Sequence, residues 1–175
     1  HGYKRITTES KSFAEWLRHI PLKDGHPDVF IYNGTKKQNQ NAHHAVIDID
    51  AGERDLQQCA DAVMRLRREY FYSINQHQLI RFHFTNGFLC DFPTWSEGYR
   101  PRVEGNDVTW RKTVLPGAIY GSFKKYMETI FVYCGSQSLS EEQTAKDLSD
   151  IYPGDVFIHG GFPGHAVIVM DVARH

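Results

Sequence analysis

A cysteine and a histidine stand where they could together cleave an amide bond. His165 follows the turn "GGFPG" and opens the apolar run "HAVIVMDV". Cys59 lies early in the helical segment "ERDLQQCADAVMRLRREYFY", for which Asp55 is the predicted N-cap. A helix N-terminus or an imidazolium nearby makes a thiol nucleophilic. This pattern predicts Cys59 as nucleophile, His165 as base and Gln58 as an oxyanion donor.

Both residues also have plain structural interpretations. Cysteine is among the most buried residue types, and the position of Cys59 on the apolar stripe of its helix favours the core. His165 is equally an ordinary turn histidine. His44, which precedes Cys59, is an alternative base. Asp171 lies six residues after His165, roughly 20 Å along an extended strand, and cannot orient its ring. The orienting group is therefore expected either to be missing from this sequence or to come from elsewhere, with Asp48, Asp50 and His83 as candidates.

The stretch "GDVFIHGGFPGHAVIVMD" at residues 154–171 resembles the signature of papain-like cell-wall peptidases of the NlpC and CHAP types. In those families the histidine occupies the place of His165 and the nucleophile precedes it on a helix, as Cys59 does. Around Cys59 the chain reads "QQCADA" where the family favours a small polar run. The resemblance implies a thiol hydrolase that acts on a peptide or glycopeptide of the cell envelope.

A second resemblance extends over nearly the whole chain. "DLQQCADAVMRLRREY" and "GDVFIHGGFPGHAVIVMD", with "GYKRI" near the start, are similar to an uncharacterised family of secreted or lipid-anchored proteins common among Bacteroidetes. This likeness implies a secreted, periplasmic or lipid-anchored location outside the cytoplasm. The chain begins at His1 without an initiator Met, so we expect a processed or trimmed product with no visible targeting segment.

The segment 87–121 is rich in Gly, Pro, Arg and aromatic residues and is expected to be a long functional loop. Its aromatic and basic side chains are candidates for stacking on sugars or peptide: Trp95, Tyr99, Arg102 and Trp110. An alternative function follows from this segment. The chain would then be a non-catalytic envelope protein that binds a glycan, a peptide or a protein partner.

Helical and strand patterns are mixed along the chain. Capping boxes at Ser12 and Ser140 predict helices over 12–20 and 140–148. Further helices are expected over 53–72 and 122–134. The first of these carries an apolar stripe formed by Leu56, Cys59, Val63, Leu66 and Tyr70. Strands are expected over 28–32, 45–50, 79–85, 155–158 and 165–172, and in 79–85 the apolar residues Ile80, Phe82 and Phe84 alternate with polar ones. The expected fold class is α+β, a largely antiparallel sheet with helices packed on it, papain-like of the NlpC/CHAP type.

Composition limits the remaining function classes. The 175 residues predict a single domain, 1–175, with 41% hydrophobic and 23% charged residues. The net charge is −1 with both signs interspersed, which argues against nucleic-acid binding. The sequence has no apolar run long enough to span a membrane. Three cysteines without a zinc-type spacing, and the absence of nucleotide-binding motifs, predict no metal and no cofactor.

Overall fold

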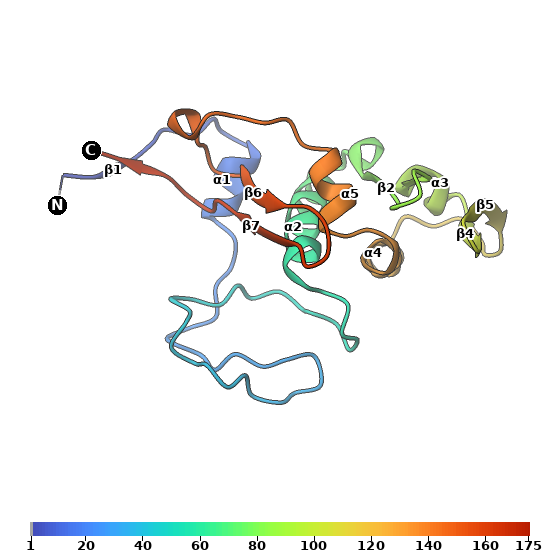
Figure 1. The fold of residues 1–175 in the computed structure, drawn as a ribbon, viewed down its shortest axis with the longest axis horizontal. Helices are drawn as coiled ribbons and strands as arrows, with labels where there is room; N and C mark the ends of the chain where they lie inside the picture. Colours follow the sequence, from blue (N-terminus) through green and yellow to red (C-terminus); the bar gives the residue numbers. More distant parts are fainter. Residues whose placement is uncertain (1) are drawn as a thin grey trace. The chain divides into compact units, whose positions relative to one another are not determined.

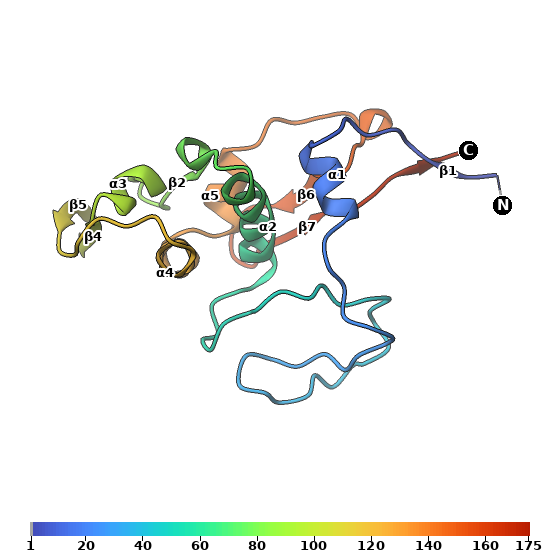
Figure 2. The same ribbon diagram turned by 180° about the vertical axis from the view of Figure 1, so that it is seen from behind.

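The computed structural model describes residues 2–175, and the chain falls into two compact units. Unit 1 comprises the chain up to Gln58, Lys146–Val156 and Ile168–His175; unit 2 comprises Cys59–Ala145 and Phe157–Val167. Short helices accompany antiparallel strand pairs (Figures 1 and 2). The expected α+β class is confirmed, although the described strands form four two-stranded sheets rather than one larger sheet.

Unit 1 is organised around α1 (Phe13–Arg18), which begins where the sequence predicts. The Ser12 hydroxyl accepts a hydrogen bond from the Glu15 N–H at 3.2 Å and so caps the helix. Three residues of α1 are buried: Phe13, Ala14 and Leu17. β1 (Lys4–Arg5) and β8 (Ala173–Arg174) pair antiparallel, which joins segments from the two ends of the sequence. The unit also contains the short 3-10 helix η2 (Leu148–Asp150).

The two strands expected over 28–32 and 45–50 are wrong. These segments form only the isolated bridges Phe30↔Lys36 and Leu22↔Ile47. Phe30 is 55% exposed, so its run of strand-favouring residues has little to pack against. Val and Ile favour strands only where a pleated surface is half buried by its neighbours.

Unit 2 holds most of the regular structure. Its elements in chain order are α2 (Cys59–Ser73), η1 (His77–Leu79), β2 (Arg81–His83), β3 (Leu89–Asp91), α3 (Phe92–Ser96), β4 (Tyr99–Glu104), β5 (Asp107–Lys112), α4 (Tyr120–Tyr133) and α5 (Ser136–Glu141). The alternation expected around β2 is confirmed, because Phe82 is buried while Arg81 and His83 are exposed. The largest fully buried side chains include Phe82, Phe92, Phe123 and Tyr126.

α2 begins later than the sequence predicts. The helix starts at Cys59, so Asp55, four residues earlier, is not its N-cap. The Asp55 carboxylate instead accepts a hydrogen bond from the Gln58 side-chain amide at 2.9 Å. Cys59 is therefore the first helical residue rather than the fourth. The expected buried stripe is confirmed at Val63 and Leu66.

The segment 87–121 is not one long loop, because it contains β3, α3 and the β4–β5 hairpin. Glu104 pairs with Asp107, so Gly105 and Asn106 form a two-residue turn. Gly105 has φ 63°, a conformation that such hairpin turns require and that glycine adopts without strain. The Gly-Asn pair between two alternating runs was a hairpin signal in the sequence.

The expected helix over 140–148 is also wrong, whereas α4 largely matches the expected 122–134. The observed α5 ends at Glu141. The Ser140 hydroxyl does not cap a new helix, because it donates to the Gln137 carbonyl of α5 at 3.0 Å.

β6 (Val156–His159) and β7 (His165–Ile168) form a hairpin, as the sequence predicts. A bulge fixes its register where it opens. Gly154 N–H donates to the Val169 carbonyl at 2.8 Å, and Val169 N–H donates to the Asp155 carbonyl at 2.9 Å. Gly154 has φ 98°, as expected for the glycine of such a two-against-one bulge.

Candidate functional site

The three thiols of the chain differ sharply in accessibility. All are free, but Cys90 and Cys134 are buried whereas Cys59 is half-buried. Burial raises the pKa of Cys90, and burial followed by the charge of Glu142 raises the pKa of Cys134 to about 12. Both buried thiols therefore remain protonated near neutral pH. Cys59 is the thiol that remains as a candidate nucleophile.

The start of α2 positions Cys59. As the first helical residue, Cys59 belongs to the turn whose N–H groups have no carbonyl partner within the helix. Such a helix end favours a nearby negative charge. Gln58, expected to be an oxyanion donor, is exposed, and its amide is turned toward Asp55.

His165 is the first residue of β7 and is exposed. From the bulge onward, each residue of β6 faces one residue of β7, and both strands have four residues. His159 therefore lies directly opposite His165, and the five-residue loop 160–164 connects the two. Burial supports this register: Phe157, His159, His165 and Val167 are exposed, whereas the alternate positions are half-buried or buried. His159 was missed from the sequence, although the symmetric "HGGFPGH" was a signal for it.

α5 supports the loop that leads into His165. The Ser136 hydroxyl donates to the Gly161 carbonyl at 3.0 Å. A Cβ at Gly160 would collide with the Ser140 hydroxyl, and a Cβ at Gly164 would collide with the Ser136 hydroxyl. The glycines of this loop therefore permit close contact with two serines of α5, which holds the backbone before His165.

Cys59 and His165 belong to the same compact unit, whereas His44 lies in unit 1. α5, which supports the loop before His165, is in contact with α2. His44 is exposed in a segment without helix or paired strand. Of the two bases that the sequence left open, His165 is thus the one that shares a unit with the thiol.

The candidate orienting groups are dispersed. Asp48 and Asp50 lie in unit 1 and His83 in unit 2. The Nδ1 atom of His83 lies 2.9 Å from Glu142 Oε1, which also accepts the His83 backbone N–H at 2.8 Å. His83 is thus itself a histidine oriented by a carboxylate.

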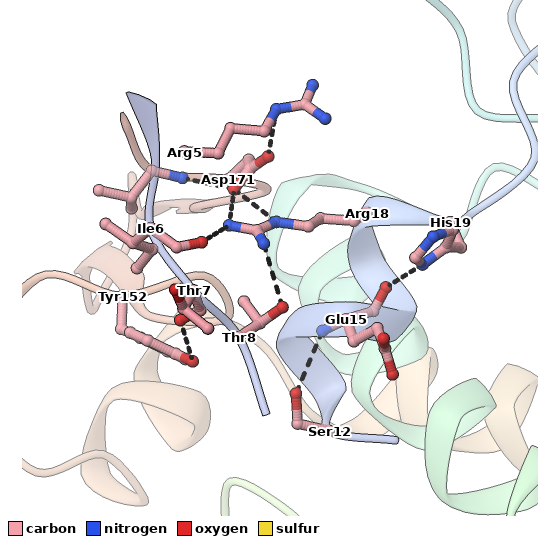
Figure 3. Close-up of polar contacts among 11 residues, drawn as sticks. Arg5, Ile6, Thr7, Thr8, Ser12, Glu15, Arg18, His19, Tyr152 and Asp171 are labelled. Atoms are coloured by element: carbon pink, nitrogen blue, oxygen red, sulfur yellow. Dashed lines mark hydrogen bonds and ion pairs between the residues drawn. The ribbon is translucent and has the colours of Figure 1, made fainter. Parts of the chain in front are cut away.

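Asp171 has a structural role in unit 1 (Figure 3). It accepts two hydrogen bonds from the Arg18 guanidinium, at 2.8 and 2.7 Å, and forms an ion pair with Arg5 at 3.0 Å. Arg18 also donates to Thr8 and to the Ile6 carbonyl. This network ties α1 to the segments around β1 and β8.

The comparisons with known proteins give one result. The family described as Domain of unknown function (4846), DUF4846, matches residues 1–175. The chain belongs to the DUF4846 family. No match was found among curated proteins or among solved structures.

The aromatic candidates of this DUF4846 chain have different environments. Trp95 is only 4% exposed, and the Arg100 guanidinium lies 3.7 Å from the centroid of the Trp95 ring. The Trp95 Nε1 donates a hydrogen bond to the Ser122 hydroxyl. Trp95 thus belongs to the core of unit 2. Trp110 pairs across the hairpin with Pro101 and is half-buried.

Tyr99 shares that face of the β4–β5 hairpin with Trp110, because alternate residues of a strand point to the same side. Tyr99 is also half-buried. Arg102 points to the other face, is exposed and pairs with Glu104 at 2.7 Å. The aromatic platform of the hairpin therefore consists of Tyr99, Pro101 and Trp110.

Within residues 2–175, no group of three or more His, Cys, Asp or Glu side chains is arranged to hold a metal ion. No helix in that range combines the length and apolar character needed to cross a membrane.

Proposed function

We propose that this DUF4846 chain is a papain-like cysteine hydrolase of the NlpC/CHAP type. It cleaves amide bonds in peptides of the cell envelope, such as those of peptidoglycan, and acts outside the cytoplasm. Cys59 is the nucleophile and His165 is the general base. The substrate class and the location come from the sequence resemblances.

One observation carries the proposal. Cys59, the thiol that is not buried, is the first residue of a helix in the same unit as His165, which opens a strand and is exposed. A thiol at a helix start and an imidazole at a strand start are the parts that a thiol hydrolase requires.

The reaction follows from these groups. His165 takes the proton of the Cys59 thiol, and the thiolate attacks the amide carbonyl carbon. Backbone N–H groups at the start of α2 donate to the developing oxyanion. The C–N bond breaks as His165 protonates the leaving amine, which leaves a thioester. His165 then deprotonates a water molecule that hydrolyses the thioester and restores the thiol.

Alkylation by iodoacetamide as a function of pH, followed by peptide mapping, tests the pair. We expect Cys59 of the native protein to react at pH 6 and His165→Ala to slow this reaction at least about tenfold. The slowing is expected because an imidazole partner increases the population of the reactive thiolate. Cys90 and Cys134 should react only after unfolding, because they are buried.

The matched control is His44→Ala, which removes an exposed histidine of unit 1. It should leave the rate unchanged. If His44→Ala slows Cys59 and His165→Ala does not, the base is misassigned. If neither variant slows Cys59, no thiol–imidazole pair exists and the proposal fails. Release of new amino groups from purified peptidoglycan, present in the wild type and absent in Cys59→Ala, tests hydrolysis itself.

The aromatic platform of the β4–β5 hairpin favours a second candidate function, binding of an envelope glycan or peptide without catalysis. Its Trp110 ring is half-buried beside Pro101. Stacking on such a ring needs no catalytic group.

For this candidate, we expect Trp110→Ala to reduce co-sedimentation with insoluble peptidoglycan, while Cys59→Ala retains it. Arg102→Ala, which changes the opposite face of the hairpin, is the control and should bind normally. Equal binding by Trp110→Ala and the wild type would exclude the platform. Binding lost in Trp110→Ala together with no hydrolysis by the wild type would favour this second function.

A further inference from the structure

The residue pair next to the loop of the β6–β7 hairpin consists of two histidines. His159 and His165 are opposite each other and both are exposed. Directly opposite residues of an antiparallel pair point to the same face, with Cβ atoms about 5 Å apart. One imidazole nitrogen from each residue of such a facing pair can therefore bind the same ion at ordinary metal–nitrogen distances of about 2.0–2.1 Å.

The backbone around this pair is constrained on both sides. The Gly154 bulge fixes the register where the hairpin opens. The loop at its closed end is held against α5 by the hydrogen bond from Ser136 to Gly161 and by close packing of Gly160 on Ser140. The two histidines therefore do not need to be brought together when a ligand binds, which lowers the entropic cost of binding.

We propose that His159 and His165 form a two-histidine site for a divalent late transition metal, with Zn²⁺, Ni²⁺ and Cu²⁺ as probes. Neutral imidazole is a preferred ligand of these ions, and the Irving–Williams order predicts that Cu²⁺ binds tightest. Water completes the coordination, since an exposed strand face leaves the remaining positions open.

A regulatory consequence rests on the proposed function. A metal ion on His165 occupies the lone pair that would accept the Cys59 proton. Bound metal should therefore slow the alkylation of Cys59 at pH 6, and EDTA should restore the rate.

A second pair of histidines provides a matched control. The rings of His26 and His43 are 4.3 Å apart with an angle of 5° between their planes. The nitrogen lone pairs lie in the ring planes, so those of face-to-face rings run parallel and do not converge on one ion. His43 Nε2 is also 3.0 Å from the Pro27 carbonyl. His26→Ala should therefore leave metal affinity unchanged.

Isothermal titration of the full chain with CuCl₂, NiCl₂ and ZnCl₂ at pH 7.5 tests the site. We expect one ion per chain. We expect His159→Ala and His165→Ala each to weaken binding by more than the roughly 10–100-fold that follows loss of an outer-shell partner. His159→Asn removes the same ligand with a polar side chain, and circular dichroism checks folding.

Undiminished binding in His159→Ala or His159→Asn, or an equal loss in His26→Ala, would overturn the site. The titration requires no catalysis, so its failure is separate from that of the hydrolase proposal. If metal binds the His159–His165 pair but does not slow Cys59 alkylation, the regulatory consequence is wrong while the site stands.

Discussion

The Arg18→Ala variant is expected to lower the free energy of unfolding by about 2–3 kcal/mol. The Arg18 side chain is 13% exposed and donates to Asp171, Thr8 and the Ile6 carbonyl (Figure 3). Hydrogen bonds to charged groups contribute about 1.5–3 kcal/mol, and partly buried acceptors without donors add a cost. Chemical denaturation monitored by circular dichroism measures the change.

Arg5→Ala is the matched control, because Arg5 pairs with the same carboxylate but is 74% exposed. Exposed ion pairs contribute at most about 1 kcal/mol, so this variant should be close to the wild type. Equal losses in the two variants would show that burial of Arg18 contributes nothing to stability.

The same pair predicts a dependence on pH. Burial alone would raise the pKa of Asp171, but hydrogen bonds from Arg18 and the Val172 N–H, with the charges of Arg18 and Arg5, leave it lowered. A lowered folded-state pKa contributes stability above the unfolded-state pKa of about 3.9, and this is lost as pH falls through the folded value. The loss of stability below pH 4 should be smaller in Arg18→Ala than in the wild type.

The Gly160→Ala variant is expected to destabilise unit 2 by about 1–3 kcal/mol, the usual cost of overpacking. The added Cβ would collide with the Ser140 hydroxyl and approach Gln137 Oε1 to 3.2 Å. The loop must then move away from α5 and displace His165, so metal affinity should also fall. Chemical denaturation and metal titration of the same sample measure both effects.

Ser140→Gly supplies the compensating change, because it removes the side chain with which the new Cβ collides. Alone it should cost about 0.5–1 kcal/mol as a glycine in a helix. In the double variant we expect a favourable coupling of about 0.5–3 kcal/mol and recovery of metal affinity. Gly117→Ala, whose Cβ would meet nothing within 4 Å, is the control and should be neutral. A purely additive double variant would mean that α5 does not position the loop.

The signals in the sequence succeeded where the partners of a segment lie close to it along the chain, as β3 does for β2. Ser12 predicted the start of α1, and the alternation around Phe82 predicted a half-buried strand. The same kind of reasoning failed for 28–32, where the residues favour a strand but receive no sheet partner. Strand formation depends on neighbours distant in the sequence, whereas a helix cap is complete within four residues.

In the candidate site, too, some features were predicted from the sequence and others were seen only in the structure. Residue type, position at the start of a predicted element and a family resemblance singled out Cys59 and His165. Only the tertiary structure showed that Cys90 is buried and that Asp171 is bound by Arg18. These facts concern burial and partners far apart along the chain, which no spacing rule contains.

By itself, the sequence determined the α+β class, the apolar face of α2 and the strand that begins at His165. The structure decided that α2 begins at Cys59, after the turn in which the Asp55 carboxylate accepts from the Gln58 side-chain amide. It also decided that His159 faces His165, since their relation depends on the register of the hairpin. Periodicity reports which face of an element is apolar, but register and burial arise only when elements pack against one another.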